Sequence, residues 1–352
     1  RPTPHIPWDS LPRSAWTKSA ASSKCVALLP DFHGTGAVRR RLHDNTESWG
    51  YLMNMLSLPK KVYFKDGCTP VALRELSEIY HLKRAFLVSS PSLYRSGAVL
   101  QVDRWLRKEG IRTAECFTIS SPPAFDEVRA ALECLREFMP DVIIGIGGGA
   151  AMGAAKALWV LYETPELDLL EIVKHPERIR TGTKAKLVLV ATSFGSGAQN
   201  SPFAVLKDDV GNVCVIHSSQ LLPELSITDA QFTKSLPPKQ IHDCGLAVLS
   251  RSVRIWSVCG EYAQCMAQEA IALVLENISA AEASCPAALG RLHNAGSLLG
   301  TACGSVIDTV VNSVLDNTEP GWEAVNADVL ELLSRTLRFP DSEAFQNACR
   351  HC

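Results

Sequence analysis

Apolar positions in the first part of the chain alternate between short continuous runs and helical spacing. Continuous runs predict buried strands at residues 61–64, 84–89, 141–146 and 187–191. Between them, apolar residues recur every three or four positions, which predicts helices at residues 71–81, 99–109, 125–138 and 150–162. Because strands and helices alternate, we predict a Rossmann-like α/β domain with a parallel sheet covered by helices on both faces.

The pattern changes after Pro237 and Pro238. From residue 241 onward helical periodicity dominates, and the Ala-rich segments 267–287 and 291–314 predict packed helices. The chain opens with several prolines, which interrupt regular helix. We therefore divide it into an irregular N-terminal arm (1–58), a Rossmann-like α/β domain (59–237) and a helical domain (238–352) that is shortened and divergent at its end.

Composition excludes several classes of protein. Of 352 residues, 46% are hydrophobic and 20% charged, which argues against a mainly disordered chain. A net charge of −2, from 35 Lys+Arg and 37 Asp+Glu, gives no basic surplus for a nucleic-acid partner. A membrane-spanning helix needs about 20 consecutive apolar residues, and we find none that is free of charge or a glycine cluster. Residues 1–24 also lack the apolar core of a secretory signal.

Three consecutive glycines follow the predicted strand at residues 141–146. Gly147, Gly148 and Gly149 lead directly into the Ala-rich helix. Such a turn lets backbone N–H groups approach a pyrophosphate, and the start of the helix adds positive potential. Glycines of this kind also occur where a helix simply packs closely on a sheet, so the turn alone leaves both interpretations open.

Longer segments resemble the iron-dependent (group III) alcohol dehydrogenases. Residues 140–162 (PDVIIGIGGGAAMGAAKALWVLY) are similar to the family signature GGGSxxDxAK, and residues 192–206 (TSFGSGAQNSPFAVL) are similar to TTSGTGSEVTPFAVV. SLPP at 235–238 and HNAGSLLG at 293–300 also match the family. Segments 45–67 and 83–94 most resemble the alcohol dehydrogenase half of bifunctional aldehyde–alcohol dehydrogenases, and the whole resemblance runs over residues 38–315.

The resemblance implies a dinucleotide-binding domain, a helical domain, and a cleft between them for NAD(P) and a divalent metal, usually iron. It implies that NAD(P), if the chain binds it, contacts the motif residues Gly147, Gly148, Gly149, Lys156, Thr192, Gly195 and Gly197. In the family the metal polarises the alcohol oxygen so that hydride can leave for the nicotinamide.

The metal-ligand positions implied by the resemblance differ from the family. Its G-x-D-A-x-T-H helix corresponds to residues 245–251, where Ala247 replaces the aspartate and Arg251 replaces the histidine. Two later histidine positions correspond to Asn312 and Asn326. An arginine side chain cannot coordinate a cation. His242 and Asp243 lie nearby as alternative ligands, but a plain pair at the start of a helix is the favoured explanation for them.

The nucleotide motifs differ as well. Ala150 and Gly153 replace the signature serine and aspartate, and Gln199 replaces a glutamate. Phe194 replaces a serine, and we expect its ring to intrude where the nucleotide would lie. Ser90 stands at the end of the second strand, where the family usually has an aspartate that helps to select NAD.

The twelve cysteines are scattered, and we interpret most of them as buried free thiols. Cys349 and Cys352 form a terminal C-x-x-C that could supply half of a zinc site, but no second C-x-x-C completes it. The divergent end of the helical domain would leave part of its apolar core exposed. Exposed apolar surface of this kind is typical of protein interfaces.

From these departures we expect a catalytically inactive, alcohol dehydrogenase-like protein. It would not be an enzyme, would need no cofactor, iron or zinc, and would serve as a structural or accessory subunit in a larger assembly of protein subunits. Two alternatives stay open: a non-catalytic NAD(P)-binding regulator, and an active metal-dependent alcohol dehydrogenase. We expect an organellar location, the mitochondrion, or otherwise the cytoplasm.

Overall fold

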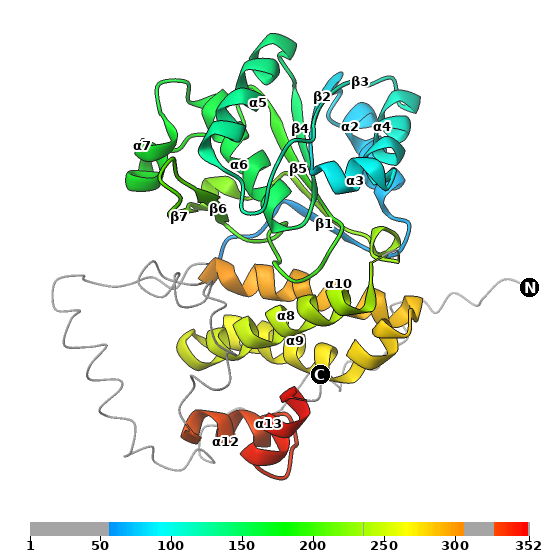
Figure 1. The fold of residues 1–352 in the computed structure, drawn as a ribbon, viewed down its shortest axis with the longest axis vertical. Helices are drawn as coiled ribbons and strands as arrows, with labels where there is room; N and C mark the ends of the chain where they lie inside the picture. The colour runs from blue at the N-terminus through cyan, green and yellow to red at the C-terminus, as the bar shows by residue number, and fades with distance from the viewer. Residues whose placement is uncertain (1–55, 235, 306–326, 351–352) are drawn as a thin grey trace, which may run out of the picture. The chain divides into compact units, whose positions relative to one another are not determined.

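The computed structural model describes residues 56–305, except residue 235, and residues 327–350. Six strands form one sheet in the order β1-β8-β5-β4-β2-β3, and every neighbouring pair is parallel. The strands are β1 (Lys61–Phe64), β2 (Arg84–Val88), β3 (Arg112–Cys116), β4 (Val142–Gly147), β5 (Lys186–Ala191) and β8 (Leu225–Thr228). Figure 1 shows this sheet above a layer of helices from the second part of the chain.

Helices cover both faces of the sheet because its central strands are apolar on both sides. Val188 and Val190 in β5 pack on one face, and Leu187 and Leu189 pack on the other. The first face carries α2 (Thr69–Glu78), α3 (Pro91–Arg95) and α4 (Ala98–Lys108); the second carries α5 (Phe125–Phe138), α6 (Gly149–Glu163) and α7 (Leu169–Lys174). The hairpin β6 (Phe203–Lys207) and β7 (Val213–His217) packs beside α6.

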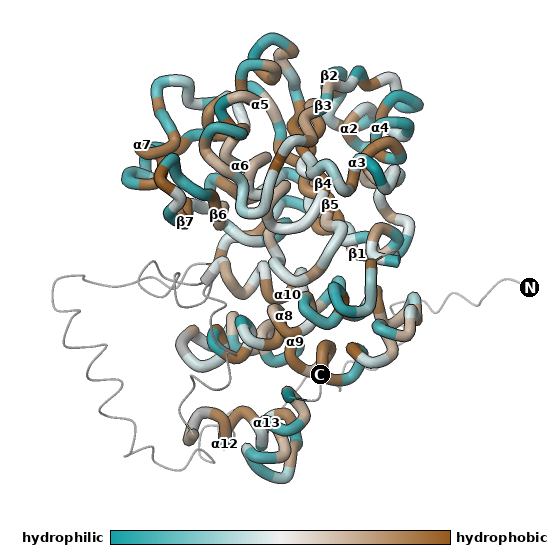
Figure 2. The backbone as a smooth tube through the Cα atoms, viewed as in Figure 1, coloured by the Kyte–Doolittle hydropathy of each residue, from teal (hydrophilic) through white to brown (hydrophobic). Residues whose placement is uncertain are grey.

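The helical layer has its own apolar core. The helical layer comprises α8 (Pro238–Val258), α9 (Glu261–Glu282), α10 (Pro286–Ala302), α12 (Ala327–Thr336) and α13 (Ser342–Arg350), and each helix contributes residues to this core. Hydrophobic colouring runs through the central strands and the facing sides of α8, α9 and α10, whereas outer loops are hydrophilic (Figure 2). Short 3-10 helices lie at Pro176–Arg178, Ser219–Leu221, Ala230–Phe232 and Cys303–Ser305.

Backbone meets backbone where the loop after β5 packs on α10. A Cβ atom added to Gly300 would lie 2.0 Å from the carbonyl oxygen of Gly197, and one added to Gly296 would lie 2.0 Å from that of Phe194. Only glycine permits this approach. Asn200 strengthens the same junction because its side chain donates to Ser297 Oγ at 2.7 Å. We call these contacts the glycine junction.

The predicted fold class, an α/β domain followed by a helical region, is confirmed. Helix α8 begins at Pro238, the first residue of the predicted helical domain. The N-terminal arm lies outside the described residues, apart from its last three positions. Among the described helices, none combines the length and apolarity needed to cross a membrane.

Candidate functional site

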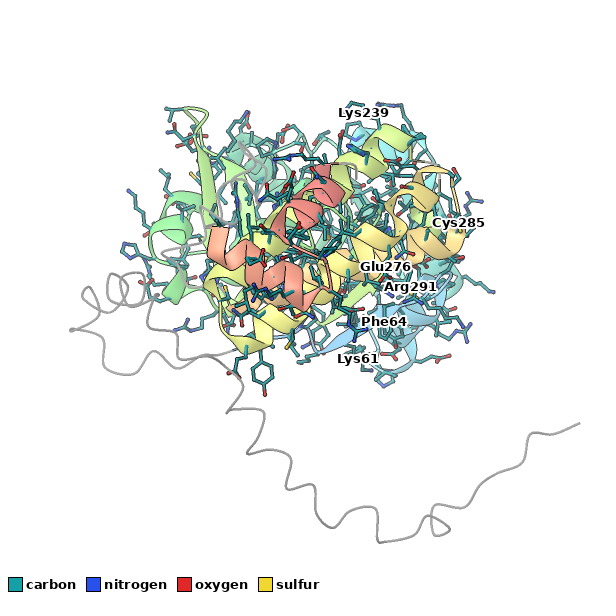
Figure 3. The ribbon with its side chains drawn as sticks, turned by 90° about the horizontal axis from the view of Figure 1, so that it is seen from below. Lys61, Phe64, Lys239, Glu276, Cys285 and Arg291 are labelled. Carbon is teal, nitrogen blue, oxygen red and sulfur yellow. The ribbon has the colours of Figure 1, made fainter. Side chains whose placement is uncertain are left out.

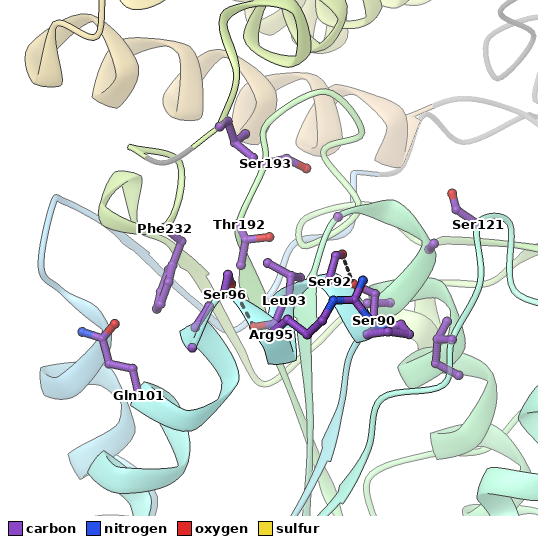
Figure 4. A pocket seen from close by; sticks show the side chains of 18 of the residues that line it. Ser90, Ser92, Leu93, Arg95, Ser96, Gln101, Ser121, Thr192, Ser193 and Phe232 are labelled. Carbon is purple, nitrogen blue, oxygen red and sulfur yellow. Dashed lines mark hydrogen bonds between the residues drawn. The ribbon is translucent and has the colours of Figure 1, made fainter.

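A cavity of about 1200 Å³ opens where β2, β4 and β5 end. Its walls come from residues 90–98 after β2, from the turn between β4 and α6, and from Thr192 and Ser193 after β5. Figure 4 shows these hydroxyl groups and Arg95 around the open space. The carboxyl ends of parallel strands are where open α/β sheets bind their ligands. We call this cavity the nucleotide cleft.

The glycine turn forms one wall of the nucleotide cleft. Gly147 ends β4 with φ of 154°, and a Cβ atom there would lie 2.7 Å from the Cβ of Ala151. Gly148 precedes α6 and Gly149 begins it, and both line the cleft with Ala150. The first N–H groups of a helix have no partner within it, so the start of α6 offers donors and positive potential to an anion.

Lys156 lies outside the nucleotide cleft. The side chain is fully buried, and Nζ donates to the carbonyl oxygens of Ala198, Ser201 and Phe203 at 2.8, 2.6 and 2.7 Å. Burial lowers the pKa of Lys156 to about 7, whereas three carbonyl acceptors match the three donors of the ammonium form. Lys156 therefore holds the loop between β5 and β6 instead of facing a nucleotide.

Two further predicted cofactor residues, Gly195 and Gly197, also face away from the cleft. A Cβ atom on Gly195 would meet the backbone of Cys244 in α8 at 3.0 Å, and Gly197 belongs to the glycine junction. Of the seven predicted residues, Gly148, Gly149 and Thr192 line the cleft, and Gly147 shapes its wall.

The expectation that Phe194 blocks the nucleotide is wrong. Its ring is fully buried in the core of the helical layer, 5.7 Å from the ring of His293 between centroids, and does not line the cleft. The backbone turns toward α10 directly after Ser193, which carries the ring away from the sheet edge.

The described residues do not fit a catalytic metal. Ala247 and Arg251 both lie in α8, and Arg251 Nη1 donates to the carbonyl oxygen of Gly195 at 3.1 Å. Burial lowers the pKa of this arginine. Asn312 and Asn326 lie outside the described residues. Within residues 56–305 and 327–350, no group of three His, Cys, Asp or Glu side chains is placed to hold a metal ion.

The alternative metal ligands have other partners. His242 Nδ1 lies 3.0 Å from Glu282 Oε1 in α9, and Asp243 pairs with Lys239 at 2.8 Å. Cys349 is buried in α13, and Cys352 lies outside the described residues. Among the residues that the structure describes, neither His242 and Asp243 nor Cys349 belongs to a group of three side chains placed to hold a metal ion.

A second, smaller cavity of about 190 Å³ lies between the β1–α2 turn and α10. Phe64 and Arg291 both line it and lie near one another in Figure 3. His293 also lines it, is fully buried, and shares a short hydrogen bond with the hydroxyl of Thr233. That hydroxyl lies 3.2 Å from the carbonyl oxygen of Thr192. Burial lowers the pKa of His293 to about 4, which keeps the ring neutral at pH 7.

Sequence reasoning missed most of the cleft wall that follows β2. It singled out Ser90, but Ser92 and Arg95 in α3 and Gln101 and Arg104 in α4 also line the cavity. The available signal was their position directly after an apolar strand, which in a parallel sheet places them at the ligand-binding edge.

Comparison with known proteins finds a family match for the α/β part of the chain. Residues 59–230 match the family described as iron-containing alcohol dehydrogenase. Aldehyde-alcohol dehydrogenase 2 of Entamoeba histolytica is 34% identical over 261 residues, covering 70% of this chain and 30% of the relative. Bifunctional aldehyde-alcohol dehydrogenase AdhE of Escherichia coli is 32% identical over 277 residues, covering 74% and 31%. The chain thus spans less than a third of the length of these relatives.

Solved structures share the fold at lower identity. The iron-containing alcohol dehydrogenase of Thermococcus thioreducens superposes with a TM-score of 0.73 at 20% identity, covering 84% of each chain. The sulfoacetaldehyde reductase of Bifidobacterium kashiwanohense, solved in complex with NAD+, gives 0.72 at 20% identity, covering 86% of this chain and 85% of the reductase.

These findings correct two of our expectations, that the chain is not an enzyme and that it uses no cofactor and no iron. The relatives at 32 to 34% identity are named as dehydrogenases, the matching family is named for its iron, and a structural neighbour holds NAD+. Residue types at a few positions were too narrow a basis for the opposite conclusion.

Proposed function

Residues 59–230 of this chain belong to the iron-containing alcohol dehydrogenase family, and we propose that the chain binds a nicotinamide dinucleotide and interconverts an alcohol and an aldehyde. The nucleotide cleft is the observation that supports dinucleotide binding. It lies at the carboxyl edge of the sheet, begins at the start of α6, and has a volume of about 1200 Å³. The interconversion of an alcohol and an aldehyde is supported by the names of the relatives.

Different segments of the cleft wall would contact different parts of the dinucleotide. The first turn of α6, at Gly148 and Gly149, presents backbone N–H groups that would hold the pyrophosphate. Residues 90–96 line the β2 side, where a ribose would lie. Thr192 and Ser193 line the β5 side, next to the helical layer. When bound, the nicotinamide ring accepts or supplies the hydride.

We derive no step through a metal, because the described residues supply no ligand set for one. The positions corresponding to Asn312 and Asn326 lie outside the described residues. Metal analysis of the purified full chain is therefore part of the test of function.

Binding is tested by calorimetric titration of the full chain with NADH and NADPH. A Gly148→Asp variant would place a carboxylate beside the pyrophosphate position and should abolish binding. A Gly290→Asp variant adds the same charge to α10, where an added Cβ atom has no neighbour within 4 Å, and should bind like the parent. Absence of binding to the parent at millimolar ligand would overturn the proposal.

Turnover is tested by following NAD(P)H absorbance with short aldehydes, with no added metal, with Fe²⁺ and with Zn²⁺. We expect consumption of the reduced dinucleotide that depends on both protein and aldehyde. If the protein binds the dinucleotide but shows no turnover under any metal condition, the proposed reaction is refuted. That result would favour the alternative of a non-catalytic NAD(P)-binding regulator.

We also propose protein partners, as the sequence led us to expect, and an organellar location. Purification from the native source under mild conditions, with mass spectrometry of the eluate, tests the partners. Co-elution with other subunits at fixed stoichiometry would support them, and elution as a small homo-oligomer would not. Fractionation of the source cells tests the location.

A further inference from the structure

We propose that Thr233 and His293 are positioning residues, which hold Thr192 and the adjoining wall of the nucleotide cleft in the geometry that binds a dinucleotide. This inference rests on the proposed dinucleotide binding and adds two residues on which the affinity depends. Both are fully buried, and neither lines the nucleotide cleft. They would act through the backbone of Thr192 and not through contact with the ligand.

Thr192 is held by hydrogen bonds on both sides. It follows β5 directly, and its N–H group donates to the carbonyl oxygen of Gly147 at 3.0 Å. Because Gly147 ends β4 at the glycine turn, this bond fixes Thr192 relative to the start of α6. On its other side, the carbonyl oxygen of Thr192 accepts from the hydroxyl of Thr233 at 3.2 Å. The position of Thr192 therefore depends on the side chain of Thr233.

Thr233 joins two segments of the cleft wall. Strand β8 lies beside β5, and the 3-10 helix Ala230–Phe232 follows β8. Phe232 lines the cleft from this segment, and Thr192 lines it from the segment after β5 (Figure 4). Thr233 comes directly after Phe232, and its hydroxyl donates across to Thr192. The hydroxyl thus links the wall after β8 to the wall after β5.

His293 sets the direction in which this hydroxyl donates. A hydroxyl has one proton, so Thr233 can donate to Thr192 only if it accepts from Nε2–H of His293, with which it shares a short hydrogen bond. Burial lowers the pKa of His293 to about 4, so at pH 7 the ring is neutral and carries one proton. With that proton on Nδ1, which has no partner among the described residues, the carbonyl of Thr192 would also lose its donor. Fewer buried groups lack partners when the proton is on Nε2.

Loss of the Thr233 hydroxyl would change the cleft because of where the carbonyl of Thr192 lies. That carbonyl belongs to the peptide group between Thr192 and Ser193, and both residues line the cleft. A buried carbonyl without its donor is unfavourable, so the peptide group would rotate toward another partner. Such a rotation moves both residues, and the preformed geometry of the wall is lost.

The test measures affinity by calorimetric titration of the full chain, with whichever of NADH and NADPH the parent binds more tightly. Thr233→Val removes the hydroxyl, keeps the branched shape and should weaken binding by about tenfold, which corresponds to one lost hydrogen bond. Thr233→Ser keeps the hydroxyl and should bind within about threefold of the parent. His293→Leu removes the donor to Thr233, places an apolar side chain beside Phe194 and should weaken binding by about threefold or more.

Thr164→Val is the matched control. Thr164 is also buried, and its hydroxyl donates to the carbonyl oxygen of Val160 at 2.6 Å. It follows the last residue of α6, about 20 Å along the helix axis from the cleft. We expect a loss of stability in urea similar to that of Thr233→Val, with a change in affinity below about twofold.

Two results would overturn the positioning role and leave dinucleotide binding standing. One is an unchanged affinity in both Thr233→Val and His293→Leu. The other is a loss of affinity in Thr164→Val as large as that in Thr233→Val, because affinity would then simply follow stability. Failure of the parent to bind either dinucleotide would overturn the proposed function and this inference together.

Discussion

Replacing Lys156 by methionine should break the contacts that hold the loop between β5 and β6. Lys156 is the buried cation whose Nζ donates to two backbone carbonyls of that loop, those of Ala198 and Ser201, and to that of Phe203 at the start of β6. Methionine keeps an unbranched apolar stem of similar length, so the change removes the donors with little change in packing volume.

The magnitude follows from the three hydrogen bonds. Bonds to a charged group contribute about 1.5 kcal/mol each at the low end of the usual range. Three of them give about 4 to 5 kcal/mol, because the variant leaves three buried carbonyl oxygens without hydrogen-bond donors. The variant no longer bears the cost of burying the ammonium, which the lowered pKa of Lys156 shows to be of similar size, so the net loss is well below that sum and we expect about 2 kcal/mol.

Urea unfolding of the parent and variant measures this loss. Lys184→Met is the control, because Lys184 is exposed and its Nζ donates to a single carbonyl, that of Tyr162, at 2.8 Å. We expect the control to lose less than about 0.5 kcal/mol. A loss below about 1 kcal/mol in Lys156→Met would show that other donors replace the lysine and would refute the reasoning.

Two more predictions concern the junction with α10. Gly300→Ala should destabilise the fold by about 3 kcal/mol or more, because its Cβ would lie 2.0 Å from a carbonyl oxygen, whereas Gly290→Ala in the same helix should be neutral or slightly stabilising in thermal unfolding. His293 has a pKa of about 4 in the fold and an ordinary value of 6.5, so the unfolded chain binds its proton first as the pH falls. Stability should therefore drop by about 3 kcal/mol from this group between pH 7 and pH 4, and a His293→Gln variant should lack that part of the pH dependence in urea titrations. An identical pH dependence in the variant and the parent would contradict the assignment.

The central part of the fold was predictable because buried parallel strands are continuous apolar runs. Strands β4 and β5 were found in this way, and β1 was placed at its observed bounds. The edge strand β3 was missed because its sequence, RTAEC, is polar and half-buried. Strand β8 was missed because its buried Ser226 breaks the apolar run, and only the fold supplies that hydroxyl with a partner, Asn200.

The candidate site was predictable only in part. The glycine turn carries a local signal, whereas the wall around Arg95 depends on β2 lying beside β4, and the order of strands is not visible in the sequence. Aligned motifs also do not show where a side chain points. Lys156 and Phe194 both sit in nucleotide motifs, yet one holds a loop and the other fills the helical core.

The glycine junction has a mechanical consequence. Thr192 and Ser193, which line the nucleotide cleft, directly precede Phe194, whose carbonyl oxygen rests against Gly296. No side chain separates the backbone of this loop from the backbone of α10, so no side-chain rearrangement can compensate for a movement of the helix. A change in the position of α10 would therefore displace Phe194, and with it the adjacent Thr192 and Ser193. The packing of the helical layer thus helps to determine the shape of one wall of the nucleotide cleft.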